Sequence, residues 1–155
     1  MELKNAGNRV VSRNEKLLIF EKEMERICDE VYISTDDGTK EHKGFVSDVL
    51  NMLIEKQYPI NIIYAIRPAV MMRAVAEFTR KYGIKTIVSL NPIMADGMGM
   101  SGACRVSIDN KLKFACVDGP EFDTHKVDFN ELIKRQRAFI SEEKRALEQW
   151  EKGAK

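Results

Sequence analysis

The sequence is poor in cysteine, and this argues against a fold held together by disulfides. The 155 residues include only three cysteines, Cys28, Cys104 and Cys116. A small secreted domain stapled by disulfides would carry more cysteines and an even number of them, so the count favours a reducing cytoplasm. The two histidines, His42 and His125, are far apart and have no metal-ligand spacing between them.

The chain also lacks a surplus of basic charge and any long apolar segment. Its formal net charge is +1, which gives no electrostatic reason to expect nucleic acid or a membrane surface as a partner. No window approaches the ~20 apolar residues of a membrane span, and the opening "MELKNAGNRVVSRNEK" has no apolar run suited to a signal peptide. With 44% hydrophobic residues, the chain has enough apolar material for the core of one compact domain.

Extended and helical patterns alternate through the first part of the chain. Extended segments are separated by apolar stripes of helical spacing, and they lie at 8–12, 30–35, 59–66 and 85–90. This β-α-β alternation predicts a parallel sheet with right-handed crossovers. The segment 59–66 is a continuous apolar run, which is typical of a strand buried on both faces. Pro68 is expected to open the helix that follows this strand.

After residue 90 the alternation stops. A loop rich in glycine and methionine precedes two alternating segments around Asp109-Asn110-Lys111, which predict a hairpin. The next stretch, 117–127, has the pattern of a second loop. The charged segment 128–151 predicts two short helices that meet near Ser141, with the basic run 134–137 as a solvated helix face. Cys28 lies on an apolar helical face and is expected in the core.

Four side chains in and around this loop and hairpin have the chemistry or the spacing of metal ligands. Asp96, Ser101, Cys104 and Cys116 follow the pattern D-x4-S-x2-C-x11-C, and glycines lie among them. Glycines let a backbone curl round an iron–sulfur cluster and direct N–H groups at its sulfides. The alternative is that the two cysteines are ordinary buried apolar residues of a small β unit. Spacing alone leaves both interpretations open.

Longer stretches of the sequence resemble a family of flavoproteins. "NPIMADGMGM", "GACR" and "FACVDGPEFD" resemble the C-terminal cluster module of a group that includes the electron-transfer subunit of dihydroorotate dehydrogenase. The group also includes the small subunit of NADH-dependent ferredoxin:NADP oxidoreductase, also described as sulfide dehydrogenase. "TDDGTKEHKGFVSDVL" and "PAVMMRAVAEFTRKYGIKTIVSLNPIM" are similar to the NAD(P)-binding domain of the same group.

The resemblance implies an α/β fold with a ferredoxin-reductase-like, Rossmann-like parallel sheet that is incomplete at its N-terminus. It divides the chain into a partial NAD(P)-binding domain (1–90), a [2Fe-2S]-type cluster module with a β-hairpin (91–127) and a C-terminal helical tail (128–155). Within the family, the cluster ligands follow the order D-x4-C-x2-C-x11-C. By this resemblance Asp96, Cys104 and Cys116 fall on ligand positions, and Ser101 stands where the family has its first cysteine.

Serine at this position puts the cluster in question. A serine hydroxyl must lose its proton to bind iron strongly, and its pKa lies far above the ~8.5 of a thiol. Oxygen is also a harder donor than iron–sulfur clusters prefer. Ser101 is therefore compatible with a labile, oxygen-sensitive cluster or with a site that has lost its cluster.

The resemblance also implies nucleotide contacts. The family places them near Asp36, Asp37 and Gly38, at the carboxyl end of a predicted strand, where open α/β sheets bind ligands; a solvent-exposed turn is the alternative. Arg67 and Pro68 correspond to a site where the family has glycine before proline, close to the nicotinamide. A long arginine there would crowd the pocket or reach a nucleotide phosphate, and a solvated arginine at a strand end is the alternative.

Two features of the family have no counterpart in this sequence. One is the FAD-binding β-barrel, and the other is the strand with a glycine-rich turn that receives the dinucleotide pyrophosphate. We therefore expect weak NAD(P) binding, FAD only through a missing domain or a partner, and no turnover by the isolated chain. Because the missing strand is central in the family's sheet, the two halves are expected to close up directly or to accept a strand from another chain, such as a second copy.

Two functions are consistent with these observations. In the first, the chain is a fragment of a cytoplasmic electron-transfer subunit. It relays electrons through a [2Fe-2S] cluster between a flavin/NAD(P) partner and a catalytic oxidoreductase subunit, such as one of pyrimidine biosynthesis. In the second, it is a degenerate remnant that acts as an interaction module without a cluster. Neither requires a nucleic acid or a membrane, and neither assigns a catalytic residue to this chain.

Overall fold

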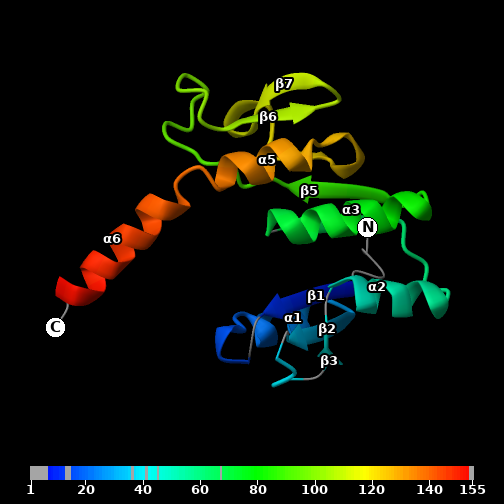
Figure 1. Ribbon diagram of the computed structural model, residues 1–155. Helices are drawn as coiled ribbons and strands as arrows, with labels where there is room; N and C mark the ends of the chain where they lie inside the picture. The colour runs from blue at the N-terminus through cyan, green and yellow to red at the C-terminus, as the bar shows by residue number, and fades with distance from the viewer. Residues whose placement is uncertain are drawn as a thin grey trace. The chain divides into compact units, whose positions relative to one another are not determined.

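The chain forms two compact units. The computed structural model describes residues 7–12, 15–35, 37–40, 42–44, 46–66 and 68–153, and the units are Met1–Pro59 and Ile60–Lys155 (Figure 1). Each unit has its own β-sheet. The boundary between them lies inside the segment that the sequence assigns to one NAD(P)-binding domain. None of the helices in the described part of the chain has both the length and the apolar character needed to cross a bilayer.

The first unit is built on a three-stranded parallel sheet. Its elements in chain order are β1 (Gly7–Ser12), η1 (Glu15–Leu17), α1 (Glu21–Ile27), β2 (Glu30–Thr35), β3 (His42–Lys43) and α2 (Val46–Glu55). The strand order is β1-β2-β3, and both pairings are parallel. The parallel pairing of β1 with β2 confirms the prediction for 8–12 and 30–35. Ile33 of β2 and Val49 of α2 are buried in this unit.

The second unit combines a mixed sheet, a hairpin and a helical tail. Its elements are β4 (Ile62–Ile66), α3 (Ala69–Lys81), β5 (Lys85–Ser89), β6 (Arg105–Ile108), β7 (Lys111–Phe114), α4 (Ala115–Asp118), β8 (Glu121–Asp123), η2 (Thr124–Lys126), α5 (Phe129–Gln136) and α6 (Ile140–Gly153). β4 and β5 are parallel, as predicted. β8 pairs with β5 antiparallel, so the prediction of a loop over 117–127 is wrong. A strand of this length is too short to show the alternation on which the sequence prediction depends.

The prediction that 59–66 is buried on both faces is also wrong. Ile62, Tyr64 and Ile66 are 39%, 59% and 60% exposed, whereas Ala65 on the opposite face of β4 is 5% exposed. The sheet order β4-β5-β8 places β4 at an edge. A continuous apolar run is buried on both sides only when other layers cover both faces of its sheet. The expectation that another strand pairs with this edge stays a prediction.

The core of the second unit surrounds α3. Met72 and Val75 of α3, Val88 of β5 and Leu132 of α5 are at most 1% exposed. α3 packs against β5, η2 and α5. This arrangement gives the sheet one covered face, and it fixes where α5 and the segment before it lie.

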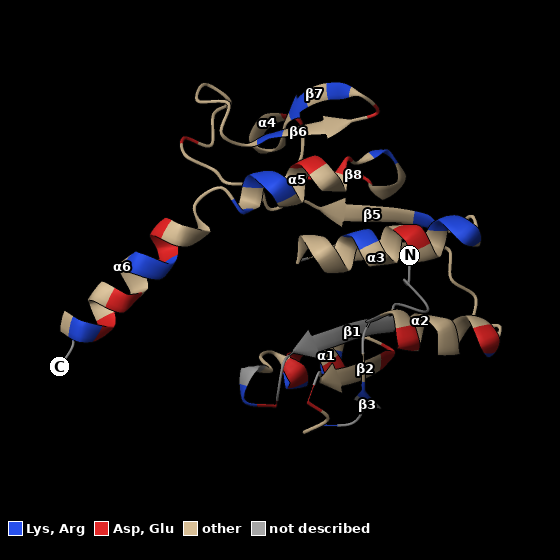
Figure 2. Ribbon diagram, viewed as in Figure 1, with Lys and Arg blue, Asp and Glu red and all other residues tan. Residues whose placement is uncertain are grey.

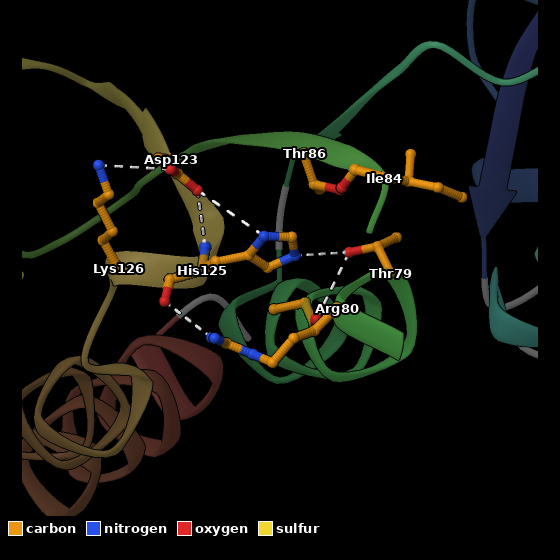
Figure 3. Close-up of polar contacts among 8 residues, drawn as sticks. Thr79, Arg80, Ile84, Thr86, Asp123, His125 and Lys126 are labelled. Carbon is orange, nitrogen blue, oxygen red and sulfur yellow. Dashed lines mark hydrogen bonds and ion pairs between the residues drawn. The ribbon is translucent and has the colours of Figure 1, made fainter. Parts of the chain in front are cut away.

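A polar cluster fastens η2 to the C-terminal half of α3 (Figure 3). Thr79 Oγ1 lies 3.0 Å from His125 Nε2, and Arg80 donates a hydrogen bond of 2.7 Å to the His125 carbonyl. Asp123 Oδ1 accepts a hydrogen bond from the His125 N–H at 3.0 Å. The sequence assigned His125 no role, and the structure shows that it ties the segment after the hairpin to α3.

The predicted helical tail is confirmed as α5 and α6. Asp128 caps α5 by accepting a hydrogen bond from Glu131 N–H at 3.0 Å. α6 begins at Ile140, beside Ser141, where the two helices were predicted to meet. Acidic and basic side chains both occur along α6 (Figure 2). None of the α6 residues is buried.

Candidate metal centre

The β6–β7 hairpin brings two cysteines side by side. Its turn, 109–110, has positive φ angles of 52° and 57°, the conformation of a two-residue hairpin turn, which Asp and Asn tolerate. The strand register pairs Arg105 with Phe114, so Cys104 precedes one strand and Cys116 follows the other. Their Sγ atoms lie 3.1 Å apart. The hairpin prediction is confirmed, and it explains how eleven intervening residues return the chain to the same place.

The two thiols differ in environment. Cys104 is fully buried, whereas Cys116, in α4, is half-buried. Hydrogen bonds from the Cys116 thiol and N–H lower the pKa of Cys104, and the same thiol–thiol hydrogen bond raises the pKa of Cys116. Asp118 holds α4 against β7, because its Oδ2 accepts a hydrogen bond from Phe114 N–H at 2.7 Å and its Oδ1 lies 3.2 Å from Lys113 Nζ.

Asp96 and Ser101 form a second pair. The Ser101 hydroxyl donates to Asp96 Oδ1 at 2.9 Å, and the N–H groups of Met100 and Ser101 donate to Asp96 Oδ2 at 2.7 and 2.9 Å. The Ser101 N–H and then its hydroxyl are the largest causes that lower the pKa of Asp96 to about 2. Asp96 is therefore ionised at neutral pH. The Ser101 oxygen also accepts a hydrogen bond from Ala103 N–H at 3.3 Å.

The two pairs lie close to each other. The negative charge of Asp96 is the smallest cause at each thiol and acts to raise its pKa, but at Cys104 the hydrogen bonds from Cys116 outweigh it. A hydrogen bond from the Gly99 N–H acts to lower the pKa of Cys116, whose net shift is upward. Gly99 has φ +80°, and a Cβ placed on it would lie 2.9 Å from Val117 Cγ2. The loop that carries Asp96 and Ser101 thus packs against the helix that carries Cys116.

The four side chains are arranged as two hydrogen-bonded pairs rather than as one open set of ligands. Within the part of the chain that the structure describes, no group of three or more His, Cys, Asp or Glu side chains is arranged to hold a metal ion. The donor types nevertheless suit iron at three positions, since two are thiols and one is an ionised carboxylate. Ser101 is the weakest iron ligand of the four, and its hydroxyl donates a hydrogen bond to Asp96.

Residues from the tail hold this loop in place, and no sequence pattern pointed to them. Arg135 donates to the Ala103 carbonyl at 3.1 Å, and Gln136 Nε2 donates to the Asn91 carbonyl at 2.8 Å. Both side chains are half-buried, so the prediction of a solvated face over 134–137 is wrong for these two residues. Only the docking of α5 decides that a polar side chain reaches a backbone carbonyl far away in the sequence.

The candidate nucleotide residues in the first unit form a turn beside a cavity. Asp36 lies outside the described residues. Asp37 Oδ1 accepts hydrogen bonds from the hydroxyl and the N–H of Thr39 at 2.7 and 3.0 Å, and these two bonds lower the pKa of Asp37. Gly38 has φ +75°, which favours glycine. Asp37 and Thr39, with Glu15 and Lys16, line a cavity of about 290 Å³.

Of the other residues singled out in the sequence, the structure describes Pro68 and Cys28. Arg67 lies outside the described residues. Pro68, in the second unit, is the N-cap of α3, and its carbonyl accepts a hydrogen bond from Met72 N–H at 3.0 Å. The predicted helix start is therefore correct to within one residue. Cys28 is half-buried at the C-terminal end of α1 and is not the core residue that was predicted.

A family model and a curated relative, both named for dihydroorotate dehydrogenase B, match this chain. Residues 91–128 match the family described as the iron–sulfur cluster binding domain of dihydroorotate dehydrogenase B. The matched segment contains the loop, the hairpin and all four candidate ligands. Over 156 aligned residues the chain is 42% identical to a Thermotoga maritima protein named as a homolog of the electron transfer subunit of dihydroorotate dehydrogenase B (NAD(+)); the alignment covers 98% of this chain and 55% of that protein.

Two further proteins match more than nine tenths of the chain. An "Uncharacterized protein in adh 3′ region" of Clostridium beijerinckii is 47% identical over 145 residues, which cover 92% of this chain and 48% of that protein. A solved structure of NADH-dependent reduced ferredoxin–NADP oxidoreductase, studied for flavin-based electron bifurcation, superposes with a TM-score of 0.83 at 38% identity and covers 94% of this chain and 52% of that one. The fold is thus α/β and ferredoxin-reductase-like, and the chain spans about half the length of the curated relatives it matches.

Proposed function

Because this chain resembles the electron-transfer subunits of the dihydroorotate dehydrogenase B family, we propose that it carries a [2Fe-2S] cluster and transfers electrons between two protein partners. One partner holds flavin and NAD(P), and the other is a catalytic oxidoreductase subunit. The observation that carries this proposal is the pair of thiols, Cys104 and Cys116, with sulfurs 3.1 Å apart beside an ionised carboxylate. All of these groups lie in the segment that matches the family's cluster domain.

The proposed ligands are Asp96, Ser101, Cys104 and Cys116. When bound, the cluster would supply one-electron transfer. The residues of this chain hold the donors in place: the hairpin sets the separation of the thiols, and the Gly99 N–H hydrogen-bonds to Cys116. Ser101 is the position at which binding is weakest, since its hydroxyl would have to give up its proton and its hydrogen bond to Asp96.

A partner subunit is part of the proposal. Met98, Met100 and Val117 are 68%, 83% and 63% exposed beside the candidate ligands. Methionine side chains adapt to irregular surfaces and are frequent where proteins bind one another. We propose that FAD is supplied by a partner or by a further domain, that NAD(P) binds this chain weakly, and that the complex works in the cytoplasm, in pyrimidine biosynthesis or in a related redox reaction.

The test is anaerobic reconstitution with iron and sulfide, followed by metal analysis and EPR of the reduced sample, on the wild-type chain and on Ser101→Cys. Two irons and two sulfides per wild-type chain, with the EPR signal of a reduced [2Fe-2S] centre, are the expected result. Ser101→Cys restores the family's ligand and should retain the cluster longer in air. If neither chain binds iron, the proposal is wrong.

A second function has its own supporting observation. The four candidate ligands form hydrogen bonds with one another, Ser101 with Asp96 and Cys104 with Cys116. This arrangement is compatible with an interaction module that keeps the fold without a cluster. Iron in the Ser101→Cys variant alone would support loss of the cluster in this chain, whereas iron in both would exclude it.

A further inference from the structure

We propose that Cys104 and Cys116 form a reversible disulfide when no cluster is bound, and that this bond prevents the cluster from being loaded. The pairing depends only on the two thiols and does not depend on the function proposed above. Its consequence for loading rests on that function. The bond would make the availability of the site depend on the thiol redox state around the protein.

The geometry of the hairpin supports this pairing. The two sulfurs lie 3.1 Å apart without a bond, and a disulfide needs about 2.05 Å. The β6–β7 ladder, closed by its two-residue turn, sets this separation, and the hydrogen bonds that Asp118 accepts from Lys113 and Phe114 hold α4 next to β7. Only a small movement of the side chains is needed, because the backbone already brings the two residues together.

The composition of the site makes the product unique. The family has a third cysteine where this chain has Ser101, and three thiols would allow three different pairings. Here Cys104 and Cys116 are the two cysteines of the second unit, and the remaining one, Cys28, belongs to the first unit. Oxidation at this site therefore has one intramolecular product and leaves no neighbouring thiol in that unit to rearrange it.

With glutathione disulfide as the oxidant, the different burial of the two cysteines determines which of them reacts first. Cys116 is half-buried and Cys104 is fully buried, so the Cys116 sulfur attacks one sulfur of glutathione disulfide. This forms a mixed disulfide and releases one glutathione, which takes the Cys116 proton. The Cys104 sulfur then attacks Cys116 Sγ and releases the second glutathione with the Cys104 proton. The protein loses two electrons and two protons, and one glutathione disulfide becomes two glutathiones.

The first experiment uses the full chain, prepared free of iron and reduced, and treated with glutathione disulfide. The mass should fall by two hydrogens, the number of titratable thiols should fall from three to one, and peptide mapping should show a Cys104–Cys116 link. Dithiothreitol should restore all thiols. An unchanged thiol count, a link that includes Cys28, or a glutathione adduct that persists on Cys116 would overturn the pairing.

Matched variants separate the steps. On oxidation, the Cys28→Ser variant should lose both of its remaining thiols and give the same Cys104–Cys116 link. Cys104→Ser should stop at the mixed disulfide and retain one glutathione on Cys116. Ser101→Cys should give more than one linked product. A single product from Ser101→Cys would show that the serine does not determine the pairing.

The second experiment tests loading. Oxidised and dithiothreitol-reduced samples are incubated with iron and sulfide, the oxidised sample without dithiothreitol. The reduced chain should take up iron and the oxidised chain should not, and reducing the oxidised chain should restore uptake. Equal uptake by both would overturn the block on loading. No uptake by either would refute the cluster and with it the block, while the disulfide would still stand on the mapping data.

Discussion

Replacing Gly99 with alanine tests how closely the ligand loop packs on α4. Gly99 has φ +80°, and its new Cβ would lie 2.9 Å from Val117 Cγ2. Gly97 is a matched control in the same loop, because it has φ +73° and no atom within 4 Å of a new Cβ. Both substitutions strain the backbone, but only Gly99→Ala also crowds a neighbour.

The expected magnitudes follow from these two effects. Alanine in the left-handed region costs about 1–2 kcal/mol, so Gly97→Ala should destabilise the chain by about that amount. Overpacking adds about 1–3 kcal/mol, and Gly99→Ala should fall at the lower end of this range because Val117 is 63% exposed and able to rotate. The total for Gly99→Ala should be about 2–3 kcal/mol.

Urea unfolding of the full chain, followed by circular dichroism, measures these differences. Val117→Ala alone should change stability by less than about 0.5 kcal/mol, whereas in the Gly99→Ala background it should recover about 1 kcal/mol, because the contact is shared. Glycine variants with equal effects, or a double-mutant cycle without coupling, would refute the packing of this loop on α4.

Three further predictions concern other contacts of the second unit. The pKa of Asp96 is about 2 in the folded chain, below the ~3.9 of an unfolded aspartate. The stabilising effect of the Asp96 carboxylate is therefore complete above pH ~4 and is lost as the pH falls toward 2. The amide NMR shifts of the loop should follow this titration, and Asp96→Asn should abolish the titration. Gln136→Ala should destabilise the chain by about 1 kcal/mol in urea because it removes the hydrogen bond to the ligand loop, and the exposed neighbour Lys134→Ala should have almost no effect. Thr79→Val should lower the thermal midpoint by an amount equivalent to about 1–3 kcal/mol, since it leaves Nε2 of the half-buried His125 ring without its hydrogen-bond partner; an unchanged midpoint would refute this contact.

Much of the fold was predictable because it depends on local patterns. The strands β1, β2, β4 and β5 lie where apolar periodicity placed them, and their parallel pairing follows from the helices between them. The hairpin was predictable from Asp109 and Asn110, which tolerate the positive φ angles of a tight turn. Pattern did not reveal β8, because three residues show no period.

The candidate ligands could be named from the sequence because their residue types and spacing are visible there, and the hairpin prediction already implied that the two cysteines would lie near each other. The pairing of Ser101 with Asp96 was not predictable, since it depends on how a glycine-rich loop turns back on itself. The contribution of Arg135 and Gln136 was also hidden, because a polar residue on a helix looks solvated until the helix is docked.

The sequence by itself determined the local elements of this protein and the chemical groups available at its site, because propensity, periodicity and turn chemistry act over a few residues. Tertiary structure alone decided which of these groups touch, which face of β4 is left uncovered and which tail residues hold the ligand loop. Those outcomes depend on the packing of segments that are distant in the chain, and no local pattern contains that information.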